Sequence, residues 1–179
     1  MRGKEDLKRA VCEAIDRRSE RIVGLGEAIM DQPELGFKEQ QTARRVSEVF
    51  GELELEHQRE LALTGVKARL KGKRKGPTLA LMGELDALIV PDHPRADPAT
   101  GAAHACGHNA QIAGLMGAAY GLAEAGITDE LAGEIAFFAV PAEEYVEIEY
   151  RLQLVKEGKT TFLGGKSELV ELGHFDDID

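Results

Sequence analysis

The stretch that decides the fold is TLALMGEL, residues 78–85, a short and almost continuous run of apolar side chains. Such a run is typical of a β-strand that is covered on both faces. A second run of this kind, GEIAFFAVP, lies at residues 133–141. Between the two, residues 108–125 place apolar side chains at helical spacing, and Gly126 follows as a stop signal. The order strand, helix, strand predicts a layered α/β domain.

The segments upstream extend the same architecture. Residues 4–31 are expected to form one long helix, and residues 39–50 a second one after Pro33 interrupts the pattern. The stretches LELE (53–56) and GVKARLK (65–71) alternate apolar and polar residues, as half-exposed strands do. Two shorter helices are expected downstream, at residues 145–157 and 167–173. The predicted fold is therefore an α/β domain with a mixed central sheet flanked by helices.

Composition excludes several classes of function. The 179 residues are 43% hydrophobic and 30% charged, as expected of one packed domain, and the formal net charge is −10. Nucleic acids and anionic membranes are therefore poor partners, and the basic run KGKRKG (71–76) is interpreted as a solvated hairpin loop. There is no apolar run of about 18 residues and no secretory signal. With only two cysteines, a reduced cytoplasmic protein is expected.

Polar side chains follow each predicted strand and precede the helix between them. Glu84 and Asp86 end the first strand in the segment GELDAL. Glu143 and Glu144 follow the second strand in the segment PAEE, and the helix is preceded by HACGH, residues 104–108. Sites in open α/β sheets gather beyond the carboxyl ends of the strands. We therefore expect the three clusters to meet at one edge of the sheet.

These side chains are suited to a divalent metal. Zinc and similar ions bind imidazole nitrogen, thiolate sulfur and carboxylate oxygen together. In HACGH, a glycine between Cys106 and His108 permits a sharp bend that would let both reach one ion. One of the adjacent glutamates would bind the ion, and the other would move the proton of a bound water. Other interpretations are a solvated pair of glutamates, an inert cysteine, or a nucleophilic Cys106 paired with His104 or His108.

Taken in order, the segments PELGFKE, GELDAL, HACGHN, PAEE and GHFDDID resemble the M20 metallopeptidase family. The resemblance is greatest to its amidohydrolase branch of aminoacylases, hippurate hydrolases and auxin-conjugate hydrolases, and it extends from about Arg21 to Asp179. It implies a three-layer, zinc-exopeptidase-like catalytic domain. It also implies hydrolysis of an amide bond in an N-acyl amino acid or a small peptide-like substrate. The water would be activated by two divalent ions, either Zn or Mn, Co or Ni.

The resemblance also assigns roles to individual residues. Cys106, His108 and Glu144 correspond to metal ligands of the family. Glu143 corresponds to the general base, which takes a proton from the bridging water and passes it to the leaving amine. Asp86 corresponds to an aspartate that supports the site, and it is grouped with Glu143 as a candidate catalytic residue.

The chain departs from the family in its motif and in its length. The family motif continues with an aspartate and a histidine where this chain has Asn109 and Gln111, so the charge and metal preference of the site are expected to differ. His104 is expected to shape the loop or to pack against it. Family chains are longer, with further histidine ligands and an inserted lid domain that forms homodimers. Residues 1–179 are therefore expected to be the N-terminal portion of the catalytic domain, without the lid and the C-terminal part.

The missing ligands lead us to expect little activity from the 179-residue chain alone. The alternative is a non-catalytic binding or scaffold protein that keeps the family fold. Glu143 argues against this alternative, because a binding protein has no use for a general base.

Overall fold

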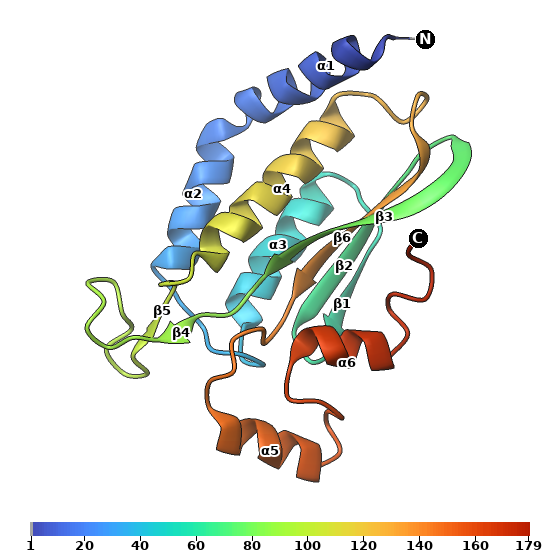
Figure 1. Ribbon diagram of the computed structural model, residues 1–179. Coiled ribbons are helices and arrows are strands. Elements are labelled where there is room, and N and C mark those ends of the chain that lie inside the picture. The colour runs from blue at the N-terminus through green and yellow to red at the C-terminus, as the bar shows by residue number, and fades with distance from the viewer. Residues whose placement is uncertain (1) are drawn as a thin grey trace.

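The structure is a computed structural model that describes residues 2–179, with six helices and two sheets in that range (Figure 1). The helices are α1 (Lys4–Arg17), α2 (Ser19–Met30), α3 (Gln40–Glu52), α4 (His108–Glu124), α5 (Ile148–Lys156) and α6 (Gly165–Glu171). The strands are β1 (His57–Leu61), β2 (Gly65–Lys71), β3 (Arg74–Glu84), β4 (Leu88–Ile89), β5 (Ala102–Ala103) and β6 (Ala132–Val140). No helix among the described residues is both long and apolar enough to cross a membrane.

Four strands form one mixed sheet in the order β1-β2-β6-β3, which confirms the predicted α/β class. Strand β6 lies inside the sheet, antiparallel to β2 and parallel to β3. In the parallel pair Glu84 lies opposite Val140, so both strands end at the same edge. Strands β4 and β5 form a separate antiparallel pair. The register of β3 and β6 therefore places the segments that follow the two strands close together, beyond their carboxyl ends.

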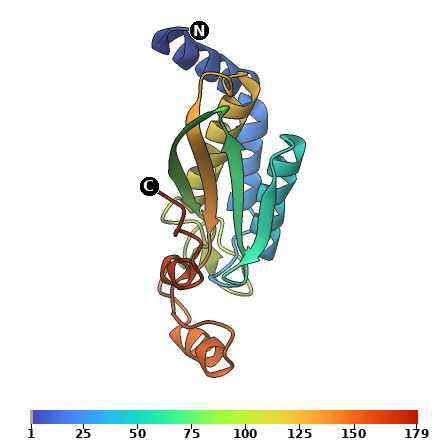
Figure 2. The same ribbon diagram turned by 90° about the vertical axis from the view of Figure 1, so that its right-hand side faces the viewer.

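Helices α1 to α4 lie on one face of the sheet, and α6 with the C-terminal segment covers part of the other, which gives three layers (Figures 1 and 2). Along β6, Phe137 and Ala139 pack with the helical layer of α2, α3 and α4, whereas Phe138 and Val140 pack with Leu169 of α6. Side chains alternate between the two faces of a strand, so a strand covered on both faces is apolar throughout. The prediction of a buried strand at residues 133–141 is confirmed.

The second prediction of a strand buried on both faces, at residues 78–85, is correct for the strand and wrong for its burial. Strand β3 includes these residues but lies at the edge of the sheet, with β6 as its only strand partner within residues 2–179. Leu79 and Met82 are 52% and 51% exposed. The apolar pattern predicts the strand correctly, but it does not show whether other elements of the fold cover both of its faces.

The single helix predicted for residues 4–31 is broken at Arg18, where α1 ends and α2 begins. Arg18 has φ −104° and ψ 5°, outside the helical region. The bend lets both helices follow α4, because Ile15 of α1 and Ile22 of α2 each pack against a glycine of that helix. The apolar stripe therefore predicts helical structure correctly, but it belongs to two helices instead of one.

Two of the predicted connections differ from the structure. The run at residues 71–76 contains the end of β2, a connection of two residues and the start of β3, and it is not a hairpin because β6 lies between those strands. Residues 53–56 do not form a strand. Leu53 and Leu55 instead pack against the core under the helices, and the first strand begins at His57. Alternation over four residues is too short a pattern to separate a strand from a turn with two buried side chains.

The remaining helices lie close to their predicted positions at residues 39–50, 108–125 and 167–173. The exception is α5, which is shorter than the predicted range 145–157. It begins at Ile148 because Glu147 adopts a φ of 50°, which cannot continue a right-handed helix.

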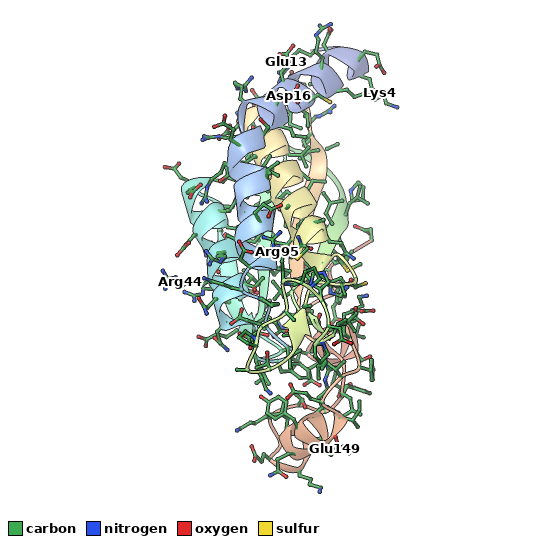
Figure 3. The ribbon with its side chains drawn as sticks, turned by 90° about the vertical axis from the view of Figure 1, so that its left-hand side faces the viewer. Lys4, Glu13, Asp16, Arg44, Arg95 and Glu149 are labelled. Carbon is green, nitrogen blue, oxygen red and sulfur yellow. The ribbon has the colours of Figure 1, made fainter. Side chains whose placement is uncertain are left out.

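The outer surface of the helical layer is charged, as Figure 3 shows. Exposed side chains labelled there include Lys4, Glu13, Asp16 and Arg44. Arg95, from the loop between β4 and β5, lies 2.8 Å from Glu27 Oε2 and donates from Nε to Asp31 Oδ1 at 2.9 Å. Such exposed pairs are screened by water and salt, so they tie this loop to α2 only loosely.

Candidate metal centre

The ends of β3 and β6 and the start of α4 bring most of the predicted site residues together. Glu84 is the last residue of β3, and Asp86 follows two positions later. Glu143 and Glu144 come shortly after the end of β6. His108 is the first residue of α4. The predicted convergence of three segments at one edge of the sheet is therefore present in the fold.

His108 is the residue around which the carboxylates gather, and its side chain is only 2% exposed. Its Nε2 atom lies 2.9 Å from Glu84 Oε2, 3.7 Å from Glu144 Oε1 and 3.9 Å from Glu143 Oε2. Its Nδ1 atom lies 2.8 Å from the backbone carbonyl oxygen of Asp86. A carbonyl oxygen can only accept, so Nδ1 carries the proton and Nε2 is the nitrogen presented to the carboxylates.

The surroundings of His108 favour positive charge. Burial by itself lowers the pKa of His108, but hydrogen bonds to Asp86 and the negative charges of Asp86 and Glu84 outweigh it and raise the pKa to about 9. The ring is therefore an imidazolium at neutral pH in these surroundings. A divalent cation bound at Nε2 would take the place of that proton, so cation binding is expected to release it.

Two groups of side chains place their donor atoms within 4.8 Å of one another. They are Cys106, His108 and Glu144, and Glu84, His108 and Glu143. The first group offers sulfur, nitrogen and oxygen, which is the mixture that zinc and the neighbouring transition metals bind. The second shares His108 and adds two carboxylates. The residues present therefore fit a divalent metal, and because both groups use His108 they are overlapping sets of donors around one imidazole.

Cys106 lies in the exposed loop ahead of α4, where Gly107 makes the predicted bend with a φ of 108°. The hydrogen bond of the thiol to Glu144, together with burial and the nearby carboxylates, raises the pKa of Cys106. Reactive cysteines have the opposite environment, with neighbours that lower the thiol pKa. The surroundings of Cys106 therefore oppose a free thiolate nucleophile and favour a thiol that ionises when a cation binds.

Asp86 and His104 lie behind the donor atoms. Asp86 is fully buried and accepts a hydrogen bond from the Glu144 backbone N–H at 2.9 Å, while its other carboxylate oxygen lies 3.5 Å from His108 Nδ1. His104 is 3% exposed, and neither ring nitrogen has a hydrogen-bond partner among the described residues. Burial, followed by the charge of His108, lowers the pKa of His104 to about 4. His104 is therefore neutral, and it belongs to neither donor group.

Two residues at the site have no role in the sequence-based prediction. The sequence puts Glu84 at the end of a strand without indicating a function for it, although it makes the shortest carboxylate contact with His108. Lys166 reaches in from α6, forms an ion pair with Glu84, and lies 3.6 Å from Glu143 Oε1. The strand-end position of Glu84 was a usable signal. Nothing in the sequence around Lys166 distinguishes it from an exposed lysine on a short helix.

A cleft of about 150 Å³ opens beside the candidate base. It is lined by Ala142, Glu143, Tyr145, Gly164, Gly165, Lys166 and Ser167. Glu143 keeps 35% of its side-chain surface exposed, more than Glu144 with 17% or Glu84 with 13%. Of the three glutamates, Glu143 is therefore the one best placed to meet a substrate that enters this cleft.

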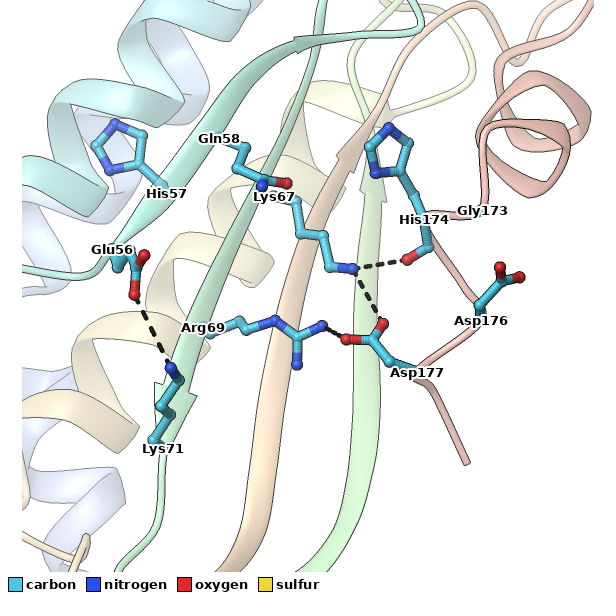
Figure 4. A pocket seen from close by; sticks show the side chains of 10 residues that line it. All are labelled: Glu56, His57, Gln58, Lys67, Arg69, Lys71, Gly173, His174, Asp176 and Asp177. Atoms are coloured by element: carbon cyan, nitrogen blue, oxygen red, sulfur yellow. Dashed lines mark hydrogen bonds and ion pairs between the residues drawn. The ribbon is translucent and has the colours of Figure 1, made fainter.

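A larger cavity of about 410 Å³ lies elsewhere, between β2 and the C-terminal segment (Figure 4). Its cationic side chains already have partners. Lys67 donates to the carbonyl oxygen of His174 at 2.6 Å and lies 3.3 Å from Asp177, while Arg69 pairs with Asp177 and Glu134. These contacts attach the C-terminal segment to the sheet, and the cavity contains none of the residues grouped around His108. Cavity size alone would therefore point away from the metal chemistry.

Comparison with known proteins gives matches along nearly the whole chain. The family model of peptidase family M20/M25/M40 matches residues 80–169. Thermostable carboxypeptidase 1 of Saccharolobus solfataricus is 32% identical over 98% of this chain and 40% of its own length. N-acyl-L-amino acid amidohydrolase of Geobacillus stearothermophilus is 32% identical over 98% of this chain and 42% of its own length. The chain thus spans about 40% of the length of these relatives.

The fold also resembles that of a solved structure from the same family. The Bacillus subtilis YxeP protein, described as a dinuclear metal binding peptidase from the M20 family, aligns with a TM-score of 0.71 and 27% identity. The alignment covers 89% of this chain and 41% of that one.

Proposed function

Because the chain belongs to peptidase family M20/M25/M40, we propose that it forms the N-terminal portion of the catalytic domain of a metal-dependent amidohydrolase. The substrate would be an N-acyl amino acid or a small peptide-like molecule, and the reaction would be hydrolysis of its amide bond. The observation that carries the proposal is the gathering of Cys106, His108 and Glu144 within 4.8 Å, with a second group of donors beside it.

The proposal assigns a role to each side chain. Cys106 Sγ, His108 Nε2 and a Glu144 oxygen would hold one divalent ion, and Glu84 would contribute to a second. When bound, such ions supply a water that ionises near neutral pH and a positive charge that stabilises the developing oxyanion. The native metal would be Zn, or one of Mn, Co and Ni.

Glu143 would act as the proton carrier. It is the most exposed of the three glutamates and lies at the cleft, so it can accept a proton from the attacking water and deliver it to the leaving nitrogen. Asp86 would act from behind. It holds the Glu144 backbone, and its carbonyl oxygen fixes the Nδ1–H tautomer of His108, which leaves Nε2 free to bind.

Further features are part of the same proposal. The relatives are more than twice as long as the segment they share with this chain, which leaves room for a lid domain, further ligands and a homodimer contact. With three strong donors at one ion, the 179-residue chain alone would bind metal weakly and turn over slowly. We place the protein in the cytoplasm, on the basis of its two free cysteines.

The test uses the longest natural form that contains residues 1–179, with metal content and hydrolysis of N-acetyl amino acids as the two measurements. The Glu143→Gln variant should retain its metal and lose about 10²- to 10⁴-fold in turnover, as expected for loss of a general base. The control is Glu149→Gln, which removes a carboxylate from the exposed face of α5. A Glu143→Gln protein with full turnover would refute the assignment. Wild-type protein that holds metal but hydrolyses none of these amides would favour the binding-protein alternative.

A further inference from the structure

The backbone that carries the two glutamates is held by buried charged side chains. The Ala142 N–H donates to Glu39 Oε1 at 2.7 Å, and the Glu144 N–H donates to Asp86 Oδ2 at 2.9 Å. Ala142 itself adopts a φ of 50°, a left-handed conformation that is unfavourable for a residue with a side chain. Such strained residues persist only where the surroundings fix them, and they concentrate at functional sites.

Arg151 of α5 holds the same segment from the carbonyl side. Its Nη1 donates to the Ala142 oxygen at 3.2 Å and to the Leu163 oxygen at 2.7 Å, and its Nη2 donates to the Glu144 oxygen. The guanidinium therefore binds the backbone on both sides of Glu143. It also lies 3.9 Å from Asp86 Oδ2, the atom that binds the Glu144 N–H.

The site of Arg151 is closed to solvent and to substrate, since only 1% of the residue is exposed. Its guanidinium lies over the rings of Phe37 and Tyr145, at 5.5 and 5.6 Å from their centres. The guanidinium occupies space that is open because residue 36 is a glycine. A Cβ at Gly36 would collide with Arg151 Nη2 and approach Ala142 to 3.0 Å. Burying the charge of an arginine without partners costs free energy, and arginine is almost never fully buried in that way. Here the contacts of the guanidinium with backbone oxygens and with Asp86 offset that cost.

We infer that Arg151 is a positioning residue for the metal centre. It fixes the Ala142 and Glu144 carbonyl oxygens, so the intervening backbone presents the Glu143 and Glu144 side chains toward His108. Its planar fork matches this task, because one guanidinium can bind several oxygens in fixed directions and a lysine cannot. The inference rests on the proposed function only in that Cys106, His108 and Glu144 are taken as cation ligands.

The competing explanation is that Arg151 merely attaches α5 to the domain. Leu154 separates the two possibilities, because it lies one turn further along α5 and packs with Phe37 and Ala142 through apolar contacts alone. The Leu154→Ala variant weakens the docking of the helix but removes none of the hydrogen bonds to the Ala142 and Glu144 oxygens.

The experiment compares wild type, Arg151→Met, Arg151→Lys and Leu154→Ala in the longest natural form that contains residues 1–179. Co²⁺ is titrated while its visible absorption is followed, and amide hydrogen exchange of Glu144 is measured without added metal. Arg151→Met should weaken Co²⁺ binding about 10- to 100-fold, the usual loss when a residue that orients a ligand is removed. Arg151→Lys should fall between it and wild type. Leu154→Ala should stay within about threefold of wild type.

Hydrogen exchange gives a readout that does not depend on metal. Exchange at the Glu144 amide should quicken at least about tenfold in Arg151→Met, relative to amides of the central strand β6, and should not do so in Leu154→Ala. If Arg151→Met fails to fold, Arg151→Lys answers the same two questions.

Equal losses in Arg151→Met and Leu154→Ala, or wild-type behaviour of Arg151→Met, would overturn the inference. The Cys106→Ala variant tests the proposed function separately. If wild type binds Co²⁺ no better than Cys106→Ala does, the metal site is wrong, and the exchange of the Glu144 amide still decides whether Arg151 fixes the segment.

Discussion

Replacing Glu39 by glutamine should change the way in which the stability of the protein depends on pH. Glu39 is fully buried and accepts hydrogen bonds from Thr64 Oγ1 at 2.6 Å and from the Ala142 N–H at 2.7 Å. Burial, opposed by the hydrogen bond from Thr64 and reinforced by the charge of Asp86, raises the pKa of Glu39 from 4.5 to about 7. The folded protein therefore holds this proton more tightly than the unfolded chain does.

The sign of the effect follows from that difference. Between pH 4.5 and 7 the folded state binds more protons at Glu39 than the unfolded state, so the contribution of Glu39 to stability is complete below pH 4.5 and is lost as the pH rises through 7. At about 1.4 kcal/mol per pH unit, the full loss is about 3 kcal/mol. About 2.5 kcal/mol of it falls between about pH 5 and 8.

Glutamine has nearly the same shape and cannot ionise, so the Glu39→Gln variant should not show this loss. Urea unfolding at several pH values from about 5 to 8, in the presence of a chelator, gives the free energy of unfolding of each protein. Relative to wild type, Glu39→Gln should gain about 2.5 kcal/mol over this range. Glu13→Gln, which changes an exposed glutamate of α1, should give a curve parallel to wild type. A parallel curve for Glu39→Gln would refute the reasoning.

Three further changes test the packing around the site and the sheet. Gly36→Ala should destabilise the protein by about 1–3 kcal/mol in urea unfolding, because its methyl group collides with the Arg151 guanidinium; unchanged stability would mean that the guanidinium can move aside. Phe50→Ala should cost about 3–5 kcal/mol, because the ring is fully buried 6.1 Å from that of Phe137, and a loss below about 1 kcal/mol would contradict this packing. Changing Leu79 and Met82 together to lysine should reduce self-association in sedimentation experiments, since both are half exposed on an edge strand; equal sedimentation of variant and wild type would show that β3 does not associate.

Much of the candidate site was predictable because it depends on where strands end. Once residues 78–85 and 133–141 are taken as neighbouring parallel strands, Glu84 and Glu143 must leave the sheet at the same edge. The glycine before His108 marks the bend that brings the third cluster to that edge. These signals are local in sequence and require only the period of a strand and the special backbone freedom of glycine.

The residues behind the site were not predictable in the same way. Arg151 occurs in a segment with a charged pattern, RLQLVKEGK, where an arginine ordinarily faces water. Its burial depends on a space left by Gly36, which is distant from it in the sequence, and on carbonyl groups of the loops before and after α5, whose conformation the sequence pattern does not give. The exposure of Leu79 has the same kind of cause, since it depends on which elements lie beside β3 and not on the strand itself.

The arrangement around His108 joins stability to cation binding. Three carboxylates, from Glu84, Glu143 and Glu144, lie within 4 Å of one imidazole nitrogen, and like charges so close destabilise the fold unless a positive charge compensates them. The imidazolium and Lys166 supply part of that charge. A bound divalent ion would supply more, and saturation at about 100 times its Kd would add about 2.7 kcal/mol to stability. The buried contacts of Glu39, Asp86 and Arg151 are therefore needed most when the cation is absent, because they hold the segment in place against that repulsion.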